Sequence, residues 1–66
     1  MAILSASEMF KVNAEQAAEF ERQGQYETAS AWWDEALKYT AGTSYANLEW
    51  ALYRSSFCKH WAPRYA

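Results

Sequence analysis

Cys58 and His60 are the residues of this sequence whose types are best suited to chemistry, since a thiolate and an imidazole form the nucleophile and base of cysteine hydrolases. They are the single cysteine and the single histidine of the chain. In a helix, side chains two residues apart diverge by about 200°. This divergence argues against a catalytic pair of Cys58 and His60. It also argues against a pair of carboxylates at Glu19 and Glu21. One cysteine and one histidine provide too few ligands for zinc. We therefore expect no enzyme activity, no metal and no cofactor, and we expect Cys58 to be a small, semi-buried packing residue.

The length of the chain limits what it can bury. Its 66 residues predict a single domain, residues 1–66, and a domain of this size buries about 60% of the surface of its unfolded chain. A single cysteine cannot form an intramolecular disulfide, so self-association or a partner must supply further stability. Aromatic residues make up 18% of the chain, including four tryptophans, and this excess is typical of an interface.

Charge divides the chain into an acidic part and a basic end. Residues 1–49 hold all eight acidic residues and three of the six basic ones, whereas residues 50–66 hold the other three basic residues and no acidic one. Because an acidic surface is repelled by phosphates, we expect no direct nucleic-acid binding and a basic protein partner for the acidic part.

The sequence indicates a soluble cytoplasmic protein without a membrane segment. The apolar start, MAILSA, lacks the charged region of a signal peptide. No apolar run is long enough to span a bilayer. A single free thiol fits a reducing compartment.

Three residues divide the chain into helical segments: Gly24, Gly42 and Pro63. No alternation typical of strands persists, so we predict an all-α fold, in which a helical hairpin is followed by a third helix. The first helix should run from about Ser7 to Gln23, after a capping box formed by SASE at residues 5–8 and before Gly24 as a left-handed stop. NAEQ at residues 13–16 is a second capping-box pattern, at which this helix could be interrupted or begin.

The second helix should run from about Tyr26 to Thr40 and place its two adjacent tryptophans on different faces. Trp33 falls on the apolar core face, whereas Trp32 and Tyr39 fall on a second, mixed stripe.

The third helix should run from about Ser44 to His60, with Thr43 or Ser44 as its N-cap. It carries two apolar stripes, and which of them is core stays open. One stripe contains Tyr45, Leu48 and Leu52. The other contains Ala46, Trp50, Tyr53, Phe57 and Trp61. Two stripes indicate that this helix packs on its own hairpin and on a second subunit or partner.

These patterns predict a core and an external face. The expected core consists of Phe10, Ala17, Phe20, Tyr26, Ala29, Trp33, Ala36, Leu37, Trp50 and Phe57. The expected partner or dimer interface consists of Trp32, Tyr39, Tyr45, Leu48, Leu52, Tyr53 and Trp61.

Two motifs suggest other classes of function. RQGQYETA resembles the turn of a DNA-binding helix-turn-helix, but the helix after it carries Glu27, Asp34 and Glu35 against Lys38, which opposes entry into a DNA groove. The hairpin also resembles one tetratricopeptide unit, which would make the protein a peptide-binding adaptor. The chain lacks a second copy and the closing proline of that repeat.

Residues 14–58 resemble the ANR family, the small AraC negative regulators of Gram-negative bacteria. The resemblance lies in the segments AAEFERQGQYETASAWWDEAL and NLEWALYRSSFC. The family motif, expected to be mostly core, falls on Ala17, Ala18, Glu21, Arg22, Gly24, Tyr26, Ala29, Trp33, Ala36, Trp50, Arg54, Phe57 and Cys58.

This resemblance implies a cytoplasmic regulator that binds AraC-type virulence activators directly and blocks their dimerisation or DNA binding. It also implies a homodimer and, for some members, a nucleoid-structuring silencer protein as a further partner. Arg54 lies one helical turn from Trp50 and from Cys58. We expect Arg54 to pair with an acid of the partner or of the first helix, and we favour an intramolecular ion pair with Glu21.

Overall fold

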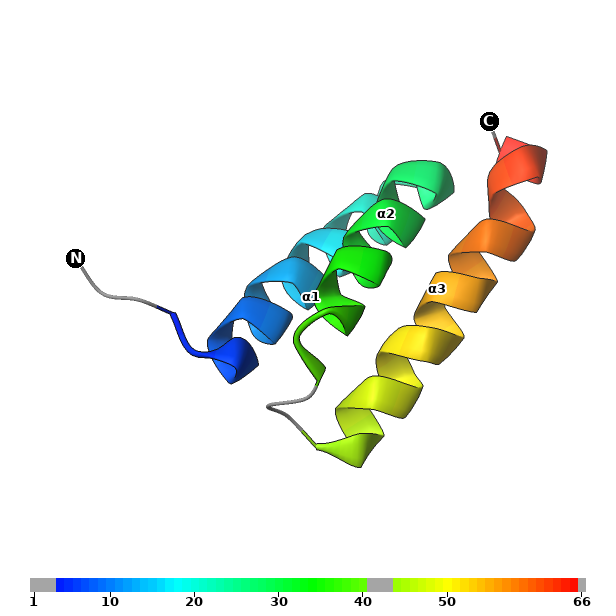
Figure 1. Ribbon diagram of the computed structural model, residues 1–66. Coiled ribbons are helices and arrows are strands. Elements are labelled where there is room, and N and C mark those ends of the chain that lie inside the picture. Colours follow the sequence, from blue (N-terminus) through cyan, green and yellow to red (C-terminus); the bar gives the residue numbers. More distant parts are fainter. Residues whose placement is uncertain (1–3, 41–43, 66) are drawn as a thin grey trace.

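The computed structural model describes residues 4–40 and 44–65, the last two by their backbone alone. Three helices account for most of this part of the chain: α1 (Ala6–Arg22), α2 (Tyr26–Leu37) and α3 (Tyr45–Tyr65) (Figure 1). The described residues contain no strand, and the predicted all-α fold is confirmed. None of the described helices is both long enough and apolar enough to cross a membrane.

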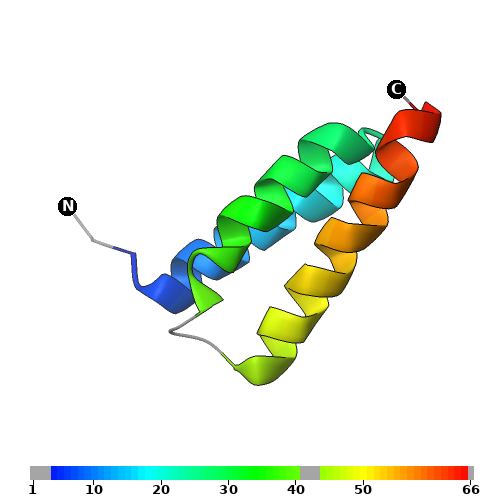
Figure 2. The same ribbon diagram turned by 45° about the vertical axis from the view of Figure 1, so that its right-hand side comes forward.

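The three helices lie side by side with α2 in the middle (Figures 1 and 2). Both α1 and α3 pack on α2, whereas they make few contacts with each other. The Cα atoms span 39 × 26 × 14 Å, so the molecule is a flat, open layer of helices. Because α1 and α3 run in the same direction, their N-terminal ends lie at the same end of the molecule (Figure 1).

The ends of α1 follow the predicted capping chemistry. The Ser5 hydroxyl accepts from the Glu8 backbone N–H at 3.2 Å, and the Glu8 carboxylate accepts from the Ser5 N–H at 3.2 Å, which confirms the capping box. Gly24 follows the helix with φ of +76°, the left-handed conformation that glycine adopts without strain. The alternative of an interruption at residues 13–16 is wrong: Asn13 is buried within the helix, where its Nδ2 donates to the Met9 carbonyl at 2.8 Å.

The core is built mainly from one aromatic residue and several alanines. Trp33 is fully buried. The small neighbours Ala29 and Ala36 on α2 and Ala17 on α1 are also fully buried, because the absence of a long side chain lets the helices approach closely. The remaining predicted core residues of the hairpin are buried or pack against this cluster: Phe10, Phe20, Tyr26 and Leu37.

α3 begins where it was predicted and ends later. The Ser44 hydroxyl accepts from the Asn47 N–H at 3.2 Å, as expected of an N-cap, while the alternative cap, Thr43, lies outside the described residues. The predicted end near His60 is wrong, because α3 continues through Pro63 to Tyr65. Pro63 lacks the N–H that would bond to the carbonyl four residues earlier, but only two helical residues follow it, so little of the helix depends on that bond.

The buried face of α3 lies between the two apolar stripes that were predicted. Its buried residues are Ala51, Ser55 and Cys58, whose small side chains allow α3 to approach α2. The expectation that Trp50 belongs to the interior is wrong in part: its ring lies edge-on to Trp33, with ring centroids 4.9 Å apart, yet 46% of the residue remains exposed. The second stripe borders this contact, since Trp50 and Phe57 meet Trp33 and Tyr26 of α2 at 4.9 and 6.0 Å between ring centroids. In the first stripe, Tyr45 and Leu52 are exposed.

Candidate protein-interaction surfaces

The solvent-exposed side of α3 carries large side chains from both predicted stripes: Tyr45 and Leu52 from one, and Tyr53 from the other. We call these three residues the outer face of α3. These residues are 72%, 48% and 65% exposed. α3 packs on α2 and makes few contacts with α1, so no described helix covers the side of α3 that faces away from α2 (Figure 1). Large apolar side chains gathered on one exposed helix face are typical of an interaction site.

Two further residues of the predicted interface lie on the margins of α3. Leu48 is half-buried. Trp61 is also half-buried and contacts the rings of Phe57 and His60, with centroids 6.2 and 5.1 Å apart. These two positions border the outer face of α3 without being its most exposed part.

Trp32 and Tyr39 occupy a different surface from the outer face of α3. Trp32 stacks on Phe20 of α1, with ring centroids 6.3 Å apart and planes inclined by 14°. Trp32 and Tyr39 are both half-buried and pack against the core. Trp32 thus joins α1 to α2 through Phe20, and it also lines a shallow depression with Asn13 and Glu35.

A groove runs between α1 and α3 and contains two depressions. The first, of about 390 Å³, lies at the N-terminal ends of both helices, and the second, of about 280 Å³, lies nearer their C-terminal ends. We call these together the α1–α3 groove. The first depression is lined by Ser7, Glu8, Phe10, Lys11, Ala14, Glu15, Asn47 and Trp50. The second is lined by Ala18, Glu21, Arg22, Tyr26, Arg54 and Phe57.

Arg54 and Glu21 form an ion pair across this groove, which confirms the predicted intramolecular partner. The Arg54 and Glu21 side chains are only 28% and 10% exposed, so solvent screens the pair weakly. The Arg54 guanidinium also lies over the Phe57 ring, 4.4 Å from its centroid. The pair therefore ties α1 directly to α3 where the two helices are otherwise apart.

Cys58 lies beneath this ion pair and is fully buried, deeper than the semi-buried position expected for it. Burial, followed by the charge and hydrogen bond of the nearby Glu21 carboxylate, raises the pKa of the Cys58 thiol from 9.0 to about 12, although the Arg54 charge opposes the shift. This environment stabilises the thiol, whereas reactive cysteines stabilise the thiolate.

We expect the Cys58 thiol to be protected in the folded protein. At pH 8, a chromogenic disulfide reagent should modify it at least about a hundredfold more slowly in native buffer than in guanidinium chloride, since both access and thiolate formation are suppressed. The unfolded chain is the control for intrinsic reactivity. Equal rates in the two solvents would contradict the buried position.

A polar cluster on α2 and α3 holds these two helices in register. The Ser55 hydroxyl donates to the Asp34 carboxylate at 2.7 Å, and the Lys59 ammonium donates to it at 3.1 Å. Partial burial acts to raise the pKa of Asp34, but the hydrogen bonds from Ser55 and Lys59, together with the Lys59 charge, outweigh burial and hold that pKa below its usual value. The cluster thus keeps a charged residue at the α2–α3 boundary satisfied.

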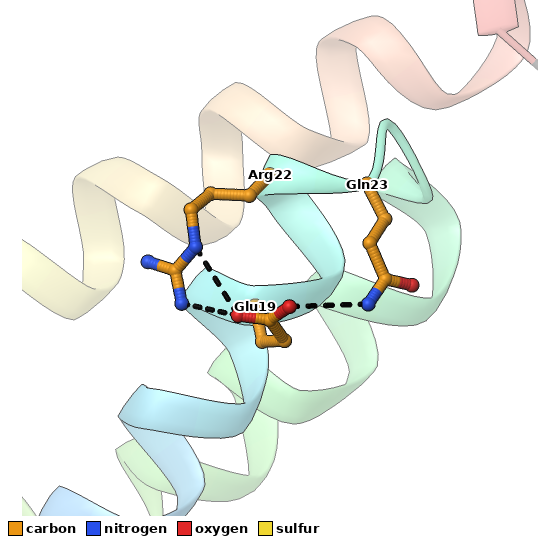
Figure 3. Close-up of polar contacts among 3 residues, drawn as sticks. All are labelled: Glu19, Arg22 and Gln23. Atoms are coloured by element: carbon orange, nitrogen blue, oxygen red, sulfur yellow. Dashed lines mark hydrogen bonds and ion pairs between the residues drawn. The ribbon is translucent and has the colours of Figure 1, made fainter.

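The outer surface of α1 neutralises part of its own charge. Arg22 and Gln23 both donate to the Glu19 carboxylate, with Nε and Nε2 each 3.2 Å from its oxygens (Figure 3). These hydrogen bonds, and then the Arg22 charge, hold the pKa of Glu19 below its usual value. Glu35 and Lys38 form a similar pair on α2. Such exposed pairs contribute little to stability.

Sequence reasoning missed Ala51, Ser55 and Asn13 as buried residues. Ala51, Ser55 and Cys58 recur at helical spacing. This stripe of small residues is the sequence signal that could have indicated which side of α3 approaches α2. Among the described residues, no group of three or more histidine, cysteine, aspartate or glutamate side chains is placed to hold a metal ion.

The residues that resemble the family motif lie largely in the interior or in the Arg54–Glu21 ion pair between α1 and α3. Ala17, Ala29, Trp33, Ala36 and Cys58 are fully buried. The exceptions include Trp50, which is half-exposed in the groove, and Arg22, which is exposed on α1 and paired with Glu19. No family model matches the chain, and neither does any curated protein or solved structure.

Proposed function

We propose that this protein is a negative transcriptional regulator that acts by binding another protein. In this proposal it is a cytoplasmic homodimer that binds an AraC-type activator directly and blocks the activator's dimerisation or DNA binding. A nucleoid-structuring silencer protein is a further proposed partner. The proposal rests on the resemblance of residues 14–58 to the ANR family and requires neither catalysis nor a cofactor.

The uncovered outer face of α3 is the observation that best supports an interaction function. A tyrosine 72% exposed and a leucine 48% exposed share this face with Tyr53. Burying such side chains against a second subunit removes apolar surface from water, and aromatic residues at the centre of an interface commonly dominate its binding energy. We therefore assign self-association to this face.

The variant Leu52→Glu should lose self-association while remaining helical. Leu52 is outside the core, so a carboxylate there costs the monomer little, but at the centre of an interface it would be desolvated without a partner. We expect weakening by about 2 kcal/mol or more, about thirtyfold in the dissociation constant. Size-exclusion chromatography with light scattering measures the mass, and circular dichroism measures helicity.

The variant Thr28→Glu provides a matched control, because it adds the same charge at an exposed position of α2. It should keep the mass of the wild type. A Leu52→Glu protein with unchanged mass would remove the outer face of α3 from the interface. Loss of helicity would instead place Leu52 in the core.

The same chromatography, with a purified AraC-type activator added, tests the proposed function itself. A shared peak of the two proteins is expected. A protein that stays separate from the activator at micromolar concentration would contradict the proposal.

The alternative of a direct DNA-binding repressor is less well supported. Its recognition helix would be α2, which is packed between α1 and α3 and exposes Glu27. Tight binding of purified protein to DNA, with steep salt dependence, would favour this alternative. The tetratricopeptide-like adaptor has one supporting observation: α1 and α3 line a common groove, as such an adaptor requires.

A further inference from the structure

The first depression of the α1–α3 groove is the surface with the most specific combination of shape, apolar area and charge. It lies at the end of the molecule where α1 and α3 both begin (Figures 1 and 2). Its volume of about 390 Å³ is large enough to accept a bulky side chain. Phe10 and Ala14 of α1 and Trp50 of α3 provide its apolar lining.

Trp50 is a large exposed aromatic residue that is held in place from beneath. Its ring is edge-on to the buried Trp33, at 4.9 Å between centroids, and tilted against Phe10, at 6.3 Å. These contacts reduce the rotamer entropy that binding would otherwise cost. An exposed aromatic ring that is already ordered is the kind of residue found at the energetic centre of interfaces.

Two of the acidic residues that lie outside the ion pairs line the same depression. Among the described residues, ion pairs join Glu19 to Arg22, Glu21 to Arg54, Asp34 to Lys59 and Glu35 to Lys38.

The described acids outside these pairs are Glu8, Glu15, Glu27 and Glu49. Glu8 and Glu15 line the depression. Lys11 is the single cation among the lining residues. The apolar floor is therefore bordered by net negative charge.

We infer that this depression binds a basic segment of the protein partner, in which an aliphatic side chain enters over Trp50 and flanking lysines or arginines face Glu15 and Glu8. The inference rests on the proposed function and names the surface and the partner chemistry. Acidic residues at the edge of a binding site favour basic peptide segments. The exposed face of an indole ring adds a cation–π attraction for lysine or arginine. A second copy of this chain is a poorer occupant, since Arg54 and Lys59 of its basic end are already paired with Glu21 and Asp34.

A short amidated peptide of leucine, lysine and arginine in amphipathic helical order is the probe that tests this. Two companion peptides separate the contributions: one replaces each lysine and arginine by glutamate, and the other replaces each leucine by serine. Fluorescence anisotropy should detect binding of the first peptide, weaker binding of the serine peptide and none of the glutamate peptide.

Two variants test the location of the peptide-binding site, and each replaces one unpaired glutamate by lysine. Glu15→Lys should weaken binding of the basic peptide about fivefold, because it turns an attraction into a repulsion at the rim. Glu27→Lys makes the same change at an exposed position that lines a depression between α2 and α3, and should weaken binding less than about twofold. Equal weakening by the two variants would overturn the site and indicate attraction by net charge alone.

The indole N–H resonances provide a direct readout of contact. The chain has four tryptophans, and Trp50→Phe identifies the Trp50 signal while keeping a ring against Trp33. The basic peptide should shift the Trp50 signal most. A spectrum in which the Trp50 signal stays unmoved at saturating peptide would overturn the inference.

Binding of the AraC-type activator to the same variants separates this inference from the proposed function. If the activator binds Glu15→Lys as tightly as the wild type, the groove is wrong and the proposed function stands. If no activator binds but the peptide distinguishes Glu15→Lys from Glu27→Lys, the groove stands and the proposed function is wrong.

Discussion

Replacing Trp33 by alanine is expected to unfold the protein. Trp33 is the largest fully buried side chain described and belongs to a core cluster with residues from all three helices. Truncation of a buried tryptophan costs about 3–5 kcal/mol through lost burial and the cavity left behind. A domain of this size has a total unfolding free energy of about 3–10 kcal/mol. Circular dichroism at 222 nm should therefore show lost helicity, or a thermal transition lowered by tens of degrees.

The adjacent tryptophan provides a matched comparison. Trp32→Ala removes the same number of atoms, but Trp32 is half-buried and contacts mainly Phe20. Its replacement should cost about 1–2 kcal/mol and leave a cooperative transition. Equal destabilisation by the two variants would contradict the assignment of Trp33 to the core and Trp32 to its margin.

Trp33→Phe refines this prediction. The Trp33 Nε1 is buried and has no hydrogen-bond partner. Phenylalanine loses ring volume but also removes this unsatisfied donor, whose burial costs about 1–3 kcal/mol. The two effects oppose each other, so the phenylalanine variant should remain folded and lie much closer to the wild type than to the alanine variant.

Local chemistry made the hairpin predictable from sequence. The capping box at Ser5 and Glu8 and the left-handed glycine at position 24 depend on residues within a few positions of each other, and both are observed. Helical spacing likewise predicted that Ala29, Trp33 and Ala36 share one face of α2, because these positions are separated by about one turn each. The ion pair between Arg54 and Glu21, which are 33 positions apart, was predicted for a different reason: an arginine within the motif needs an acidic counter-charge.

The position of α3 could not be derived in the same way. Its two apolar stripes are similarly hydrophobic, and neither indicates which neighbour will cover it. Ala51, Ser55 and Cys58 are the buried residues of α3, and their small side chains let α3 approach α2 closely, while Trp50 and Phe57 contact α2 at the edge of this face. As a consequence, Trp50 lines the groove. The depression that it forms with Phe10 depends on the distance between α1 and α3, and the spacing of residues in the sequence does not determine that distance.

Replacing Arg54 by methionine should destabilise the fold by about 2 kcal/mol or more. Methionine keeps the apolar stem that packs near Phe57, but it leaves the Glu21 carboxylate, 10% exposed, without its cation. An ionised group left unpaired at low exposure costs more than an exposed pair contributes. Chemical denaturation followed by circular dichroism should give a lower midpoint with an unchanged slope, since the same surface is exposed on unfolding.

A double-mutant cycle determines whether the pair, and not either residue alone, is responsible. Glu21→Gln removes the carboxylate that would otherwise be unpaired, so the double variant Glu21→Gln with Arg54→Met should be less destabilised than the two single variants added together. We expect a coupling of about 1–2 kcal/mol. The exposed pair of Glu19 and Arg22, with side chains 51% and 67% exposed, is the control and should give about 0.5 kcal/mol or less. Additive effects in the first cycle would mean that Arg54 stabilises the protein through its packing on Phe57, and that α1 and α3 are held together by α2 and not by their own ion pair.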